Sequence, residues 1–110
     1  MNEKTARLLE LVKENPELPI VPMVDGEIVA GDDFGVWMGA WGNARVDSYV
    51  IDQNDMVQFK SDDDVFDVLE RCLSEEEFDA LPETESECRV AYDALPWKEA
   101  IIVDVMMPNV

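Results

Sequence analysis

The stretch Phe34–Tyr49, FGVWMGAWGNARVDSY, decides the predicted fold of this chain. It holds two of the three tryptophans and three of the five glycines. An aromatic segment runs into Gly42-Asn43, a small-residue pair typical of tight turns, and a segment of alternating polarity follows. The pattern predicts a β-hairpin with its turn at Gly42-Asn43.

The faces of this hairpin follow from strand geometry. Residues two apart share a face, so Trp37, Gly39 and Trp41 should lie together. The glycine leaves a gap that a helix, a partner or one of the indoles would fill. Two interpretations stay open: the indoles pack in the core, or they form an exposed surface for a sugar or a partner chain. In the second, Trp97, directly after Pro96, would extend that surface.

Length and charge narrow the classes of function. The 110 residues, 47% of them hydrophobic, predict a single domain, 1–110, with a real core. The 26 acidic and 8 basic residues, with no histidine, give a net charge of −18. This excess disfavours nucleic acid and anionic membranes as direct ligands, because phosphate binding requires lysine and arginine. It favours cations or another, basic protein as partner; alternatively, the charge only keeps the protein in solution.

The expected compartment is cytoplasmic. Residues 2–15 are amphipathic and charged from residue 3, unlike a signal peptide. No apolar run approaches the length of a membrane span. Cys72 and Cys88 are therefore expected to stay reduced, with Cys72 as a small buried hydrophobe.

Helices are predicted over residues 3–14, 61–73 and 83–94 from apolar side chains at helical spacing. Asn15-Pro16 ends the first, and Ser61 is the expected N-cap of the second. Ser74 and Glu77 match a capping box, which predicts a further short helical turn.

Strands are predicted at residues 20–24, at 27–30, through the hairpin, at 56–60 and at 98–107. Pro22 places the first at a sheet edge, and residues 35–60 should form a three-stranded antiparallel meander. The last strand is apolar on both faces and should lie inside the sheet. The predicted fold class is α+β: a mostly antiparallel sheet of four to five strands, an N-terminal helix, and two helices before the last strand.

The acidic residues concentrate in one region. Asp62–Glu87 contains twelve acids and one base, Arg71. Asp63, Asp67 and Glu70 follow steps of four and three, so they should line one helix face. Such a face could mimic nucleic-acid phosphates and occupy the basic groove of a DNA-binding protein, or it could be a solvated surface.

No pattern for catalysis or metal binding stands out. Without histidine, no Ser-His-Asp or Cys-His arrangement exists, and no phosphate-binding glycine loop is present. Residues 52–57 lack the central glycine of a calcium loop, and isolated cysteines do not predict zinc. With 26 acids, the presence of a carboxylate pair carries no information. We expect no catalytic residue, no metal and no cofactor.

Three segments carry a family resemblance: LPIVPMV at Leu18–Val24, W-x-G-x-WG at Trp37–Gly42 and AIIV at Ala100–Val103. Through them the chain resembles small uncharacterised proteins encoded by phages, prophages and mobile elements of Gram-positive bacteria. The resemblance covers under half of the chain and gives no activity. It implies a mobile-element gene, a setting in which small acidic proteins sometimes block host defence enzymes.

The resulting hypothesis is a non-enzymatic protein-binding module, with a nucleic-acid mimic as its sharpest form. The candidate contact residues are Asp63, Asp67, Glu70, Trp37 and Trp41. The alternative is a self-associating structural or accessory protein, a homodimer through its Trp37–Trp41 face. A third class, an enzyme of unknown type that uses carboxylates, has no supporting motif.

Overall fold

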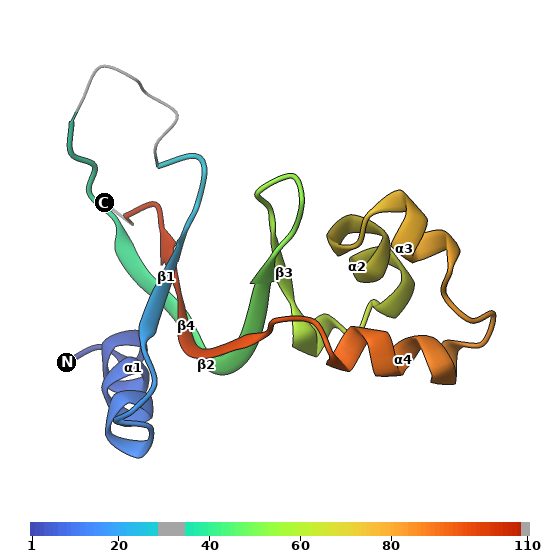
Figure 1. The fold of residues 1–110 in the computed structure, drawn as a ribbon. Coiled ribbons are helices and arrows are strands. Elements are labelled where there is room, and N and C mark those ends of the chain that lie inside the picture. Colours follow the sequence, from blue (N-terminus) through green and yellow to red (C-terminus); the bar gives the residue numbers. More distant parts are fainter. Residues whose placement is uncertain (29–34, 109–110) are drawn as a thin grey trace. The chain divides into compact units, whose positions relative to one another are not determined.

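The computed structural model describes residues 1–28 and 35–108. The chain divides into two compact units, residues 1–46 with 100–110 and residues 47–99, which we call the discontinuous unit and the inserted unit. The expectation of a single domain stays a prediction. In chain order the elements are α1 (Glu3–Glu14), β1 (Ile20–Val24), β2 (Ala40–Ile51), β3 (Val57–Phe59), the 3₁₀ helix η1 (Lys60–Asp62), α2 (Val65–Cys72), α3 (Glu75–Asp79), α4 (Glu85–Asp93) and β4 (Lys98–Met106) (Figure 1).

The strands form a four-stranded mixed sheet in the order β1-β4-β2-β3. β1 is parallel to β4, and β2 is antiparallel to β3. The α+β class, the N-terminal helix and the interior position of the last strand are confirmed. The mostly antiparallel sheet is wrong, because β1 and β4 are joined by a long connection and run the same way. Three α-helices, not two, lie between β3 and β4 in the described part of the chain.

The predicted hairpin turn at Gly42-Asn43 is wrong. β2 runs through both residues without reversing, and neither adopts the positive φ that a tight hairpin turn requires. Residues 35–39 belong to no strand, so the predicted meander reduces to the β2–β3 hairpin. Of the strand predicted at 27–30, Glu27 and Ile28 lie in a turn, while residues 29–30 and the start of the hairpin at Phe34 lie outside the described residues.

The discontinuous unit is built on α1 and β4. The Asn2 side chain caps α1 by accepting a 2.8 Å hydrogen bond from the Thr5 amide, and the helix has the predicted bounds. The core cluster joins one face of α1 to β4. Its buried members are Leu8, Leu11, Ile101 and Val103.

The outer edge of β1 is protected by Pro22. The Ile101 amide donates to the Pro19 carbonyl, and the Asp25 amide donates to the Val105 carbonyl, each at 2.9 Å. In a parallel ladder alternate residues bond to the same neighbour, so the backbone groups of Ile20, Pro22 and Val24 point away from β4. Proline therefore removes an N–H from the free edge and none from the ladder, which confirms the edge prediction.

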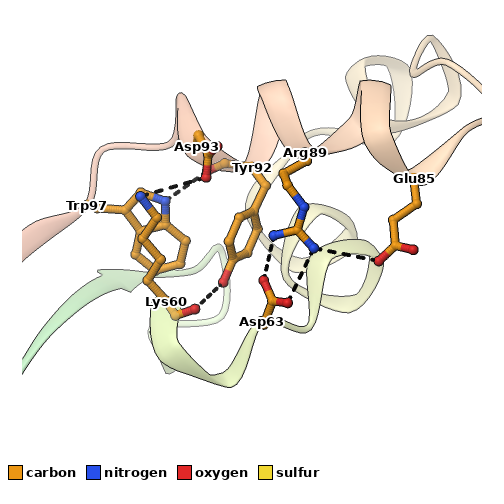
Figure 2. Close-up of polar contacts among 7 residues, drawn as sticks. All are labelled: Lys60, Asp63, Glu85, Arg89, Tyr92, Asp93 and Trp97. Carbon is orange, nitrogen blue, oxygen red and sulfur yellow. Dashed lines mark hydrogen bonds and ion pairs between the residues drawn. The ribbon is translucent and has the colours of Figure 1, made fainter.

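The inserted unit has its own core between α2 and α4. Tyr92 and Trp97 pack edge to face with centroids 5.1 Å apart, and the Tyr92 hydroxyl donates to the Lys60 carbonyl at 2.7 Å (Figure 2). The Trp97 indole N–H donates to the Tyr92 carbonyl at 2.8 Å, so Trp97 belongs to this core and not to an exposed platform. The buried members are Val65, Val68, Leu69, Cys88 and Tyr92.

Candidate protein-binding surfaces

Apolar side chains gather at the surface of the discontinuous unit, just before and at the start of β2. Val36 is 87% exposed, Met38 74%, Trp41 48% and Trp37 38%. Of the two interpretations of the indoles, the structure therefore favours the exposed one. Large contiguous apolar patches are unusual on monomers and mark contact sites.

Gly39 and Gly42 let the residues before and at the start of β2 lie close against β4. A Cβ built on Gly39 would lie 2.5 Å from Val105 Cγ1, and one built on Gly42 would lie 2.9 Å from Met106 Sδ. The gap expected at Gly39 is thus filled by Val105 of β4. Met106 is half-exposed and lies over Gly42, on the face of β2 opposite to Trp41, because adjacent side chains of a strand alternate faces. We call Val36, Trp37, Met38 and Trp41 the tryptophan surface.

The second candidate surface, the acidic one, is arranged differently from the prediction. Asp63 lies before α2, at the end of η1, with a left-handed φ of 54°. Arg89 of α4 donates to both carboxylate oxygens of Asp63, at 2.7 and 3.3 Å, and approaches Glu85 at 3.8 Å (Figure 2). The hydrogen bond from Arg89 is the main cause that lowers the pKa of Asp63. Asp63 therefore helps to hold η1 to α4 and is not part of an α2 face.

Ser61 is not the N-cap of α2, so the predicted start of this helix is wrong. It lies within η1, and its Oγ donates to Asp47 Oδ2 at 2.5 Å instead of capping a helix. α2 begins four residues later, after Asp64. Short polar side chains compete for local backbone groups, so a run of serine and aspartates starts a turn as readily as a helix.

Asp67 and Glu70 do lie on α2. Asp67 accepts a 3.0 Å hydrogen bond from Arg71 Nε, one turn along the helix, and Glu70 is exposed. The side-chain hydrogen bond with Asp67 is the main cause that raises the pKa of Arg71. Asp63 and Asp67, two of the three candidate acids, thus accept hydrogen bonds from arginines, which reduces their field toward a partner.

α3 carries four exposed acidic residues within its five positions. Ser74 Oγ accepts from the Glu77 amide and Glu77 accepts from the Ser74 amide, which confirms the capping box. No base occurs within the helix sequence, EEEFD. Its exposed acids are Glu75, Glu76, Glu77 and Asp79.

We expect added salt to raise the melting temperature. The chain carries a net charge of −18, and many of its acids lie exposed on α3 and around α4, so screening should relieve their repulsion in the folded state. Thermal unfolding at low and moderate sodium chloride measures this, and an unchanged melting temperature would show that the charges are already compensated.

Two buried carboxylates of the inserted unit were not foreseen from the sequence. Asp47 and Asp52 are 8% and 6% exposed. Asp52 Oδ1 accepts from the Asn54 and Met56 amides at 2.8 and 3.0 Å, and Oδ2 accepts from Gln58 at 2.9 Å. These hydrogen bonds lower the pKa of Asp52 below its ordinary value of 3.8, and the bond from Gln58 is the largest cause. Asp52 therefore orders the β2–β3 turn.

Asp52 should make the protein acid-sensitive. The pKa of Asp52 is lower in the folded than in the unfolded chain. Its contribution to the free energy of unfolding is therefore fully present above about pH 4 and is lost as pH falls through the folded pKa. Asp52→Asn should flatten the fall in unfolding free energy between about pH 5 and pH 3. Urea titrations across that range measure the slope. Asp55→Asn, an exposed acid of the same turn, should change it less; equal changes would contradict the assignment.

Both cysteines are free thiols. Cys88 is buried, with Sγ 3.1 Å from the Pro82 carbonyl, while Cys72 is only half-buried. Burial is the main cause that raises the pKa of the Cys72 thiol. Cys72 therefore lacks the electropositive surroundings of a reactive thiol.

Comparisons of the chain with protein-family models, curated proteins and solved structures found no match. The resemblance to phage and mobile-element proteins stays a prediction. Within residues 1–28 and 35–108, no three acids or cysteines lie close enough together to hold a metal ion. Among the helices described, none combines the length and apolarity needed to cross a membrane.

Proposed function

We propose that this chain is a protein-binding module that contacts a basic protein through its tryptophan surface. The observation that carries the proposal is the exposure of Trp37 and Trp41 beside Val36 and Met38. Tryptophan is the side chain most enriched among residues that dominate binding energy, and methionine adapts to partner shapes.

The charge of the chain favours a basic partner over a second copy. Two copies would each bring a net charge of −18, and their repulsion opposes association. A basic protein would be attracted from a distance and oriented before contact. Self-association through Trp37 and Trp41 is therefore the weaker alternative, and sedimentation of the isolated protein at low and high salt tests it.

The decisive experiment compares capture by matched variants. Immobilised parent protein, Trp37→Ala, Trp41→Ala and Gly35→Ala are exposed to one lysate, and each retained protein is purified and titrated. Gly35→Ala is the control, because a Cβ there meets nothing within 4 Å. A basic partner that binds the parent and the control should lose at least about 30-fold in affinity with either alanine variant.

Three results would contradict the proposal. They are an identical captured set for all four proteins, a retained partner that is acidic, and an affinity that ignores salt between about 50 and 500 mM. Because Trp37 and Trp41 are 38% and 48% exposed, each alanine variant should lower the urea midpoint moderately and still fold. A large drop in midpoint would instead assign the indoles to the core.

Nucleic-acid mimicry is a second candidate, carried by the exposed acids of α3. It requires the partner to be displaced by DNA or RNA and to lose affinity steeply with salt. Reversal of Asp63 is an unsuitable test, because a lysine there would face Arg89. Neutralising Glu75, Glu76 and Asp79 to their amides is the sharper variant.

The matched control for that variant removes equal charge from the discontinuous unit, at Glu10, Glu14 and Glu17, all exposed. Mimicry predicts loss of binding for the α3 variant only. Equal losses would indicate general electrostatic attraction, and no loss in either would leave the acids of α3 as a solvated surface.

A further inference from the structure

A pocket of about 250 Å³ lies at the carboxyl ends of the parallel strands β1 and β4. The strands end together because Val24 pairs with Val105 and the Asp25 amide closes the ladder on the Val105 carbonyl. The pocket is smaller than the roughly 300–1,000 Å³ typical of sites for drug-sized ligands, so it suits a single side chain. Its lining residues are Met23, Val24, Asp25, Asp104, Val105 and Met106.

The lining combines an apolar floor with negative charge. Two methionines and two valines supply the apolar part, and Asp25 and Asp104 are acidic. None of the described residues that line it is basic. The complementary group is therefore an apolar side chain with a cation directly beside it.

The pocket adjoins the segment that carries the tryptophan surface. The connection runs through Val105 and not through Met106, which lies over Gly42 on the face opposite to Trp41. Val105 lines the pocket and fills the space over Gly39. A partner that contacts the segment around Gly39 therefore lies next to a residue that lines the pocket.

Strand addition at the nearby free edge is a poor alternative mode. Pro22 removes an N–H from the outward side of β1, so an added strand would miss a hydrogen bond in the middle of the edge. Recognition here depends on side chains and not on a backbone ladder.

We infer that this pocket binds an apolar side chain of the partner that is flanked in sequence by arginine or lysine. The inference rests on the proposed function and names the chemistry that the same surface selects. It commits to a basic partner segment as the occupant, and a second copy of this chain is one outcome of the test.

The probe is the blocked peptide Gly-Arg-Leu-Arg-Gly, observed through methyl-labelled methionines. Met23 and Met106 line the pocket, while Met1 and Met56 lie elsewhere and serve as internal references. Saturable shifts confined to the pocket methionines are expected. The peptides Gly-Arg-Ser-Arg-Gly and Gly-Glu-Leu-Glu-Gly should produce none, since each lacks one of the two required features.

The matched variant is the double change Asp25→Asn and Asp104→Asn. Asparagine keeps an oxygen that can accept from the Glu27 amide, as Asp25 does at 3.0 Å, so the turn is retained. Peptide affinity should fall about tenfold, as expected for a lost charge-assisted contact. Glu3→Gln with Glu10→Gln removes equal charge elsewhere and should leave the affinity unchanged.

Several results would overturn the inference: equal binding of the glutamate peptide, shifts at every methionine, or unchanged affinity in the double variant. Shifts at Met23 and Met106 that grow with protein concentration alone would assign the pocket to a second copy. If capture depends on Trp41 while the peptide fails to bind, the pocket inference is wrong and the proposed function stands. If the peptide binds while Trp41→Ala captures the partner normally, the pocket inference stands and the proposed function is wrong.

Discussion

Leu69→Ala should lower the free energy of unfolding by about 3–4 kcal/mol. Leu69 is fully buried in the core of the inserted unit, where α2 meets α4. Removing its branched side chain loses the transfer free energy of the buried carbons and leaves a cavity that a close-packed core fills only in part. Urea unfolding followed by circular dichroism measures the loss.

The matched control lies on the same helix. Phe66 is 45% exposed, so Phe66→Ala removes a larger side chain but little packing. Phe66→Ala should lower the free energy of unfolding by well under half as much as Leu69→Ala. A similar loss for both variants would show that α2 turns a different face to the core. Circular dichroism of both variants before unfolding checks that α2 still forms.

Gly39→Ala should destabilise the protein by about 1–3 kcal/mol, although it adds a single methyl group. The new Cβ would lie 2.5 Å from Val105 Cγ1, and valine is too stiff at χ1 to move aside freely. The segment before β2 or the end of β4 must shift. Gly35→Ala adds the same methyl group where nothing lies within 4 Å and is the control.

Urea midpoints of the two alanine variants decide the question. A Gly39→Ala protein as stable as Gly35→Ala would mean that β4 yields easily at Val105. The same measurement bears on binding, because a shift at Gly39 also displaces the neighbouring indoles. We therefore expect Gly39→Ala to weaken partner capture as well, whereas Gly35→Ala should not.

Local patterns predicted the elements whose causes are local. α1 has its predicted bounds because its apolar spacing and Asn15-Pro16 act within a few residues. Pro22 at the sheet edge and the Ser74–Glu77 capping box follow for the same reason. The central place of β4 could be predicted because a strand that is apolar on both faces has to be covered on both.

The errors arose where a distant residue decides the local structure. Gly42 was assigned to a turn, but it is small because Met106 and Asp104 of β4 lie against it. Asp63 was assigned to a helix face, but Arg89, 26 residues away, binds it before that helix begins. The parallel pairing of β1 with β4 and the burial of Asp52 likewise depend on contacts that no short window of sequence contains.

The pairing of β1 with β4 also orders events during synthesis on the ribosome. Ile20 pairs with Ile101, so β1 has no partner until almost the whole chain has been made. At about 5–20 residues per second, that wait lasts roughly 4–16 seconds. The inserted unit has a core of its own, and the buried residues of that core, from Val65 to Tyr92, all precede β4 in the chain. A nascent chain that ends after Trp97 and is held outside the ribosome by a C-terminal linker should therefore display a folded inserted unit, while Leu8 and Leu11 stay open to chaperones.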